Sequence, residues 1–142
     1  DRDCTKLSKP YEDMADVMAD LQCAGMRLFV VTNKTEAQAQ KIILHFFGEN
    51  LFEGVYGNIP GRKTKPDPAF VLDILKKAAV PRDKAVFIGD SNVDIQTALN
   101  VGIDSVGAVW GFRGEQELRE AGADKLACHP RDLLEILLEN DK

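Results

Sequence analysis

The sequence predicts an α/β fold, a three-layer, doubly wound, Rossmann-like arrangement around a mostly parallel sheet. Short apolar runs alternate with segments of helical periodicity along the whole chain. The clearest run is Ala85–Ile88, which is followed by Gly89 and Asp90. Four consecutive apolar residues are typical of a strand that is buried on both faces, as the strands of parallel sheets are. Ligands of such folds bind at the carboxyl ends of the strands, so the residues after each strand are the place to look for a site.

The expected elements follow from apolar periodicity and from the residues that start and stop helices. Pro10 is suited to a first helical turn, and Gly25 and Gly48 are suited to helix ends. The expected helices are Pro10–Cys23, Thr35–Phe47, Ala69–Ala79, Asn92–Asn100, Gly114–Ala121 and Pro130–Leu138. The expected strands are Arg27–Thr32, Leu51–Gly57, Lys84–Ile88, Ile103–Val109 and Lys125–Cys128.

Composition narrows the class of protein. The 142 residues are 44% hydrophobic and carry a net charge of −5, with lysines and arginines scattered along the chain. Scattered basic residues argue against a nucleic-acid partner, and no apolar run is long enough to span a membrane. Three cysteines without metal-ligand spacing predict reduced thiols and a cytoplasmic protein. The oligomeric state cannot be read from these features.

Asp90 and Asp94 form an acid pair just beyond the Ala85–Ile88 strand, about one helical turn apart. Two neighbouring carboxylates repel unless a positive charge lies between them, and a hard cation with oxygen ligands would supply it. The alternative is that Asp90 only caps the following helix and that Asp94 is an exposed acid in its first turn.

Further polar residues end the other strands. Thr32 and Asn33 follow the Arg27–Thr32 strand, and Lys65 lies in a polar loop rich in Gly, Pro and Lys. A hydroxyl, an amide, a lysine and paired acids at one edge suit a phosphate group with its Mg²⁺. We therefore expect Thr32, Lys65, Asp90 and Asp94 to meet at the carboxyl edge of one parallel sheet. Taken singly, Thr32-Asn33 is also consistent with a helix cap, and Lys65 with a solvated surface lysine.

In this order the motifs resemble those of the haloacid dehalogenase-like hydrolase superfamily, and within it the phosphoglycolate phosphatase-like group. Val30–Lys34 is similar to the second motif, Lys65–Pro68 to the third, and Gly89–Asp94 to the acidic fourth motif. The resemblance implies a magnesium-dependent phosphatase of small phosphorylated metabolites that works through an aspartyl-phosphate. It implies catalytic and substrate-binding roles for Thr32, Asn33 and Lys65, and a Mg²⁺ site at Asp90 and Asp94.

The first motif of the family is not matched as well as the other three. The family nucleophile is the first Asp of an Asp-x-Asp-x-Thr motif that follows a hydrophobic strand. Asp1-Arg2-Asp3-Cys4-Thr5 has these letters, but no strand precedes it and Cys4 stands where glycine is usual. Asp1 and Asp3 are therefore weak candidates. We expect residues 1–11 to be a linker that returns from an absent cap domain and residues 12–142 to be a partial core.

In the family, the strand of the first motif lies in the middle of the sheet, between the strand ending at Thr32 and the one ending at Ile88. We expect that strand to be missing here, which would leave the chain as given inactive. Two other functions remain open: an inactive binding domain that keeps the fold, and a receiver-like signalling domain. A receiver places its acid pair early and its lysine late, which is the reverse of the order seen here.

Overall fold

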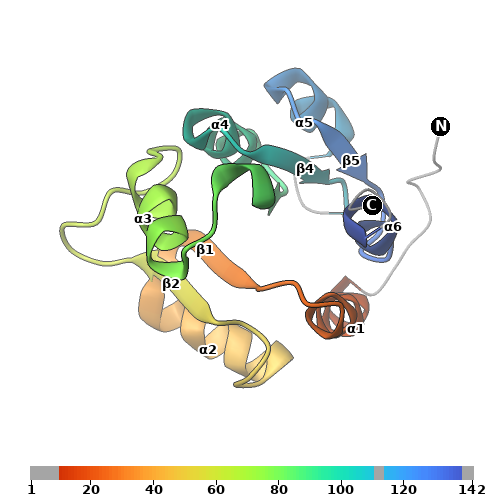
Figure 1. Ribbon diagram of the computed structural model, residues 1–142, viewed down its shortest axis with the longest axis horizontal. Coiled ribbons are helices and arrows are strands. Elements are labelled where there is room, and N and C mark those ends of the chain that lie inside the picture. The colour runs from red at the N-terminus through yellow and green to blue at the C-terminus, as the bar shows by residue number, and fades with distance from the viewer. Residues whose placement is uncertain (1–9, 111–113, 139–142) are drawn as a thin grey trace. The chain divides into compact units, whose positions relative to one another are not determined.

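The computed structural model describes residues 10–110 and 114–138, and every strand pair in these ranges is parallel. The helices are α1 (Pro10–Cys23), α2 (Glu36–Phe47), α3 (Ala69–Ala78), α4 (Asn92–Val101), α5 (Glu115–Ala121) and α6 (Asp132–Leu138). The strands are β1 (Phe29–Thr35), β2 (Gly54–Asn58), β3 (Val86–Gly89), β4 (Asp104–Ala108) and β5 (Lys125–Ala127). The predicted α/β fold with parallel pairing is confirmed (Figure 1). The chain divides into two compact units, and the strands of the described residues form two sheets.

The first unit contains residues 10–64 and 130–138. Its sheet pairs β1 with β2, with Phe29 opposite Gly54, and α2 packs on both strands. Helices α1 and α6 pack together, and each has fully buried side chains: Val17 and Leu21 in α1, and Leu133 in α6. Val17 and Leu21 lie four residues apart and therefore on one face of α1, as the apolar periodicity predicts.

Strand β1 does not end at Thr32 as expected. It continues to Thr35, and its register with β2 is irregular between Val31 and Thr35. The N-cap of α2 is Thr35, whose Oγ1 accepts a hydrogen bond from the Gln38 amide at 3.4 Å. Thr32 therefore lies within the strand and does not cap α2. An irregularity of this kind in the pairing of two strands changes the direction in which the side chains near the end of the strand point.

An ion pair between Arg62 and Glu36 lies at the carboxyl end of this sheet. Arg62 Nη1 donates to Glu36 Oε1 at 2.6 Å and to the Gly57 carbonyl oxygen at 2.8 Å. A Cβ on Gly57 would lie 2.5 Å from the Lys34 carbonyl oxygen, so only glycine lets β2 approach the start of α2 this closely. The hydrogen bond from Arg62 holds the pKa of Glu36 below its usual value.

This pair predicts a pH-dependent contribution to stability. A carboxyl whose pKa is lowered by folding stabilises the fold above its unfolded pKa and loses that contribution as the pH falls through the folded pKa. We expect Arg62→Ala to lower the free energy of unfolding by about 1 kcal/mol at pH 7. The difference from wild type should become smaller as the pH falls to about 3, because the Glu36 carboxyl then takes up a proton while the bond from Arg62 to the Gly57 carbonyl oxygen remains. Urea unfolding of both proteins at the two pH values tests this, and an equal difference at both would contradict it.

The second unit contains residues 65–129, and its sheet has the order β3-β4-β5. The middle strand β4 is the buried one, with Val106 and Ala108 only 2% and 5% exposed. Strand β3 is an edge strand with Val86 38% exposed, so the expectation that Ala85–Ile88 is buried on both faces is wrong. An apolar run indicates that a strand belongs to a parallel sheet, but it does not indicate which other elements cover that strand.

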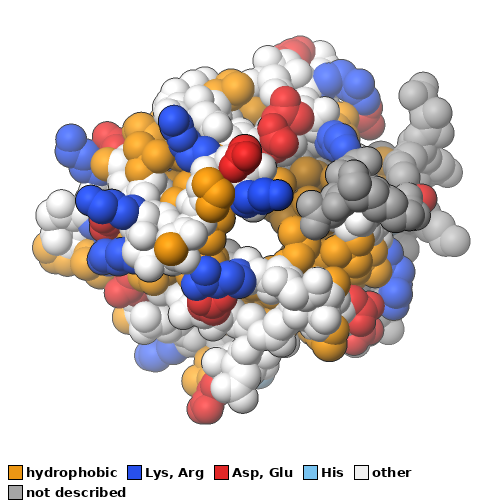
Figure 2. Space-filling view, viewed as in Figure 1, with side chains coloured by type: hydrophobic (Ala, Val, Ile, Leu, Met, Phe, Trp, Pro, Cys, Tyr) orange, Lys and Arg blue, Asp and Glu red, His pale blue; other side chains and the backbone are white. Residues whose placement is uncertain are grey.

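Two other expectations concern the surface and the thiols. Cys23 is free and exposed, whereas Cys128 is disulfide-bonded, so the prediction of reduced thiols is wrong for Cys128. Within the described ranges, no helix has the length and apolar character needed to cross a membrane. On the face shown in Figure 2, basic and acidic side chains are interspersed, in line with the scattered charges of the sequence.

Candidate functional site

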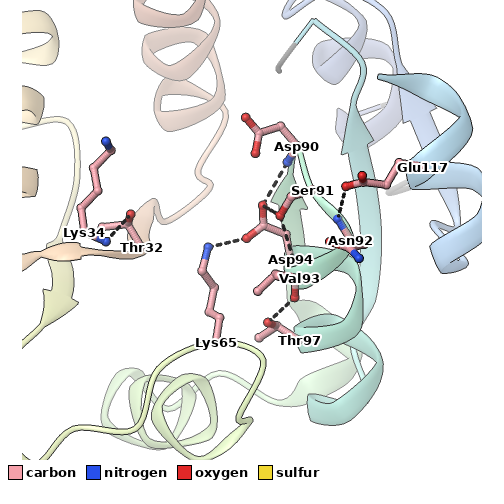
Figure 3. Close-up of polar contacts among 10 residues, drawn as sticks. All are labelled: Thr32, Lys34, Lys65, Asp90, Ser91, Asn92, Val93, Asp94, Thr97 and Glu117. Atoms are coloured by element: carbon pink, nitrogen blue, oxygen red, sulfur yellow. Dashed lines mark hydrogen bonds and ion pairs between the residues drawn. The ribbon is translucent and has the colours of Figure 1, made fainter. Parts of the chain in front are cut away.

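The turn from β3 into α4 is built around the carboxylate of Asp94, a residue that is buried. Its Oδ2 accepts hydrogen bonds from the Asp90 amide at 3.1 Å and from Ser91 Oγ at 3.3 Å (Figure 3). Ser91 is the N-cap of α4, and its Oγ accepts from the Asp94 amide at 3.4 Å. The two side chains thus bond reciprocally in the manner of a capping box. The alternative in which Asp90 is the cap and Asp94 is exposed is therefore wrong.

Gly89 is required by the close approach of Asp94. A Cβ at this position would lie 2.1 Å from Asp94 Cβ and 2.4 Å from its Cγ. The φ angle of Gly89 is outside the left-handed region that favours glycine. The residue therefore supplies space for the buried acid, and a special backbone conformation is not the reason for its presence.

Lys65 is the positively charged partner of Asp94. Its Nζ forms an ion pair with Asp94 Oδ1, and the two side chains are 13% and 9% exposed. The loop that carries Lys65 is fixed to α4, because Asn100 Nδ2 donates to the Pro66 carbonyl oxygen at 2.9 Å. The alternative of a solvated surface lysine is therefore wrong. The buried Asp94 carboxylate is thus surrounded by a cation and by two hydrogen-bond donors.

Asp90 differs from Asp94 in being exposed to solvent. In Figure 3 both carboxylates project to the same side of the β3–α4 turn. The Lys65, Asp90 and Asp94 side chains together carry a net charge of −1, which favours a cation. No group of three or more His, Cys, Asp or Glu residues positioned to hold a metal occurs in the part of the chain that the structure describes.

The remaining candidates belong to the other unit or to residues outside the described ranges. Thr32 and Asn33 belong to β1 of the first unit, where Thr32 Oγ1 accepts from the Lys34 amide at 3.2 Å. Their convergence with the acid pair remains a prediction. Asp1 and Asp3 lie outside the described residues. The structure thus brings together Lys65, Asp90 and Asp94, although 29 positions separate Lys65 from Asp94 in the sequence.

Sequence reasoning missed one residue of this site. Glu117, in the first turn of α5, accepts a hydrogen bond from the Asn92 amide at 3.0 Å. An acid in a first helical turn is common because it complements the helix dipole. Nothing in its sequence position indicates which backbone amide of another helix it meets.

These features define an α/β protein with a lysine–aspartate pair and a second acid at the carboxyl end of a parallel strand. The chain belongs to the haloacid dehalogenase-like hydrolase family, whose profile matches residues 2–108. The assignment agrees with the resemblance of the three motifs.

Named relatives support this assignment. The chain is 34% identical to phosphoglycolate phosphatase of Colwellia psychrerythraea, over 79% of this chain and 50% of that protein. It is 27% identical to N-acetylmuramic acid 6-phosphate phosphatase of Pseudomonas aeruginosa, over 94% of this chain and 60% of that protein. The chain thus spans only half to three-fifths of the length of these relatives.

Solved structures show the same similarity. A protein of Lactobacillus delbrueckii subsp. bulgaricus, provisionally named a phosphoglycolate phosphatase, superposes with a TM-score of 0.82 at 35% identity, over 88% of this chain and 52% of that one. CbbY of Rhodobacter sphaeroides, solved as a variant with xylulose-(1,5)bisphosphate, superposes with a TM-score of 0.71 at 25% identity, over 84% of this chain and 53% of that one.

Proposed function

We propose that this chain provides the second, third and fourth motifs of a magnesium-dependent phosphatase that acts on small phosphorylated metabolites. The buried Lys65–Asp94 ion pair beside the exposed Asp90 is the observation that supports this proposal. The named relatives act on different phosphorylated compounds, so the resemblance supports the reaction class and leaves the substrate open.

The acids fit Mg²⁺ on chemical grounds. Magnesium is usually bound by one or two carboxylates, with water and substrate phosphate oxygens completing the shell. Oδ2 of Asp94 already accepts two hydrogen bonds, and Oδ1 is paired with Lys65. A carboxylate has about four acceptor positions, which leaves one on Oδ1. Asp90, which is exposed, and Asp94 would hold the ion, and the bound ion would neutralise charge on a phosphoryl group.

Lys65 has two roles under this proposal. It fixes the Asp94 carboxylate, and its ammonium group stabilises negative charge on the transferred phosphoryl group. Thr32 and Asn33 would bind the phosphoryl oxygens through their side chains and the neighbouring amides. Phosphoryl transfer depends chiefly on positioning and charge neutralisation, and these residue types provide both.

The nucleophile is the remaining component. In the family reaction an Asp carboxylate attacks phosphorus, the bond from phosphorus to the ester oxygen breaks, and water then hydrolyses the aspartyl-phosphate. We propose that residues 1–11 are a linker and that Asp1 and Asp3 do not serve as this nucleophile. Residues 12–142 would then form a partial core.

A phosphatase assay tests the proposal. Phosphate release from an aryl phosphate with Mg²⁺ should be absent for the chain as given and for its Asp1→Asn variant. It should appear when an apolar strand ending in Asp-x-Asp is joined upstream. In that extended version, Lys65→Met should lower kcat by about 100-fold or more, because one stabilising charge in the transition state is lost.

Two results would contradict the proposal. An extended version that folds and shows no turnover would argue for an inactive binding domain. Robust turnover by the chain as given, abolished by Asp1→Asn, would identify Asp1 as the nucleophile and would show that residues 1–11 are not a linker. Lys77→Met is the control for Lys65→Met, because Lys77 is 76% exposed and its ion pair with Asp73 lies on the surface of α3.

A further inference from the structure

The amino terminus of α4 is held by a side chain from a different helix. Glu117 Oε2 accepts from the Asn92 amide at 3.0 Å, and Asn92 is the first residue of α4 (Figure 3). The first amide groups of a helix have no partner within that helix. An acceptor supplied by α5 therefore fixes the start of α4 at a point between Asp90 and Asp94.

Packing next to Glu117 keeps this acceptor in place. Leu118 is fully buried, and a Cβ on Gly107 of β4 would lie 3.1 Å from Leu118 Cβ. Gly107 therefore lets α5 pack closely on the middle strand of the sheet. Because α5 is anchored one residue after Glu117, the carboxylate reaches α4 from a rigid position.

The β3–α4 turn is held by bonds within it and by one bond from another helix. Within the turn, the Asp90 amide and Ser91 Oγ donate to Asp94 Oδ2. From outside, Glu117 Oε2 of α5 accepts from the Asn92 amide. The Asp90 side chain itself is exposed. The position of its carboxylate consequently depends on how well the backbone of residues 90–92 is held, and Glu117 contributes to holding it.

We propose that Glu117 is a positioning residue for the divalent-cation site at Asp90 and Asp94, a role that rests on the proposed function. Its Oε2 is engaged by the Asn92 amide, and it acts on the site through that amide. Residues that orient metal ligands by hydrogen bonds typically contribute about 10- to 100-fold to metal affinity. The loss of the Glu117 carboxylate should therefore weaken cation binding without removing a ligand.

Magnesium titration of three proteins tests the role. We expect Glu117→Ala to bind Mg²⁺ about tenfold more weakly than wild type, as measured by calorimetry. Glu117→Gln should bind within about twofold of wild type, because its amide oxygen still accepts from Asn92. Glu120→Ala is the matched control, since Glu120 is an exposed acid of the same helix whose Oε1 accepts from Gln116 Nε2 of that helix.

Amide hydrogen exchange provides a second readout that needs no metal. Exchange at Asn92 should be faster in Glu117→Ala and near the wild-type rate in Glu117→Gln.

Unchanged Mg²⁺ affinity in Glu117→Ala would overturn the inference. Equal weakening by Glu117→Ala and Glu117→Gln would also overturn it, because the effect would then be one of charge alone. If wild type binds no Mg²⁺, the proposed function fails, and unchanged exchange at Asn92 in Glu117→Ala would overturn the positioning role independently.

Discussion

Lys65→Met is expected to lower the free energy of unfolding by about 3 kcal/mol, because it leaves the buried carboxylate of Asp94 without its cation. The two side chains are 13% and 9% exposed, so solvent replaces little of what is lost. Urea denaturation at pH 7 measures the change. Lys77→Met, which breaks a solvent-exposed pair in the same unit, should cost less than about 1 kcal/mol.

A double variant separates the pair from other effects of the substitution. Lys65→Met/Asp94→Asn should be more stable than Lys65→Met alone, because no unpaired charge is then buried. If Lys65→Met costs no more than Lys77→Met, the ion pair does not stabilise the site and its assignment fails. A double variant that is less stable than Lys65→Met would contradict the same point.

Gly89→Ala is expected to have a similarly large effect for a steric reason. The added Cβ would lie 2.1 Å from Asp94 Cβ, and neither atom is at the free end of a flexible side chain. Either the backbone of β3 or the start of α4 must shift, which we expect to cost about 3 kcal/mol. Mg²⁺ affinity should fall as well, because Asp94 can no longer occupy its position.

Gly122→Ala is the control for this steric effect. Gly122 has φ 99° and ψ 28°, and a Cβ on it would lie 3.7 Å from Leu99 Cδ1, which is an ordinary contact. The cost there is the strain of a left-handed backbone conformation, about 1 kcal/mol. Chemical denaturation of both variants gives the comparison, and a loss for Gly89→Ala equal to or smaller than that for Gly122→Ala would contradict the steric account.

Local signals in the sequence were enough to predict much of the fold. Pro10, which suits a first helical turn, and Gly25, which suits a helix end, predicted the bounds of α1. The apolar run before Gly89 gave β3 to within two residues at each end. The polar residues after that run gave the pair Asp90 and Asp94, because strand ends of parallel sheets are where polar groups gather.

Tertiary contacts account for what the sequence could not predict. The ladder with β2 extends β1 past Thr32, and a pattern within one strand does not contain that information. The edge position of β3 leaves Val86 exposed, although its neighbours are apolar. In the sequence Glu117 is like any other acid in a first helical turn. Its hydrogen bond with the Asn92 amide exists because α5 packs on β4 next to α4.

The central claim is that Asp90 and Asp94 together hold a divalent cation, and calorimetric titration with Mg²⁺ tests it most directly. Wild type should show weak, saturable binding at one site, because magnesium rarely has more than two carboxylates as dedicated ligands. Asp90→Asn, at an exposed position where the fold should be unaffected, should abolish that binding. Binding by Asp90→Asn with wild-type affinity, or the absence of binding by the folded wild-type chain, would contradict the claim.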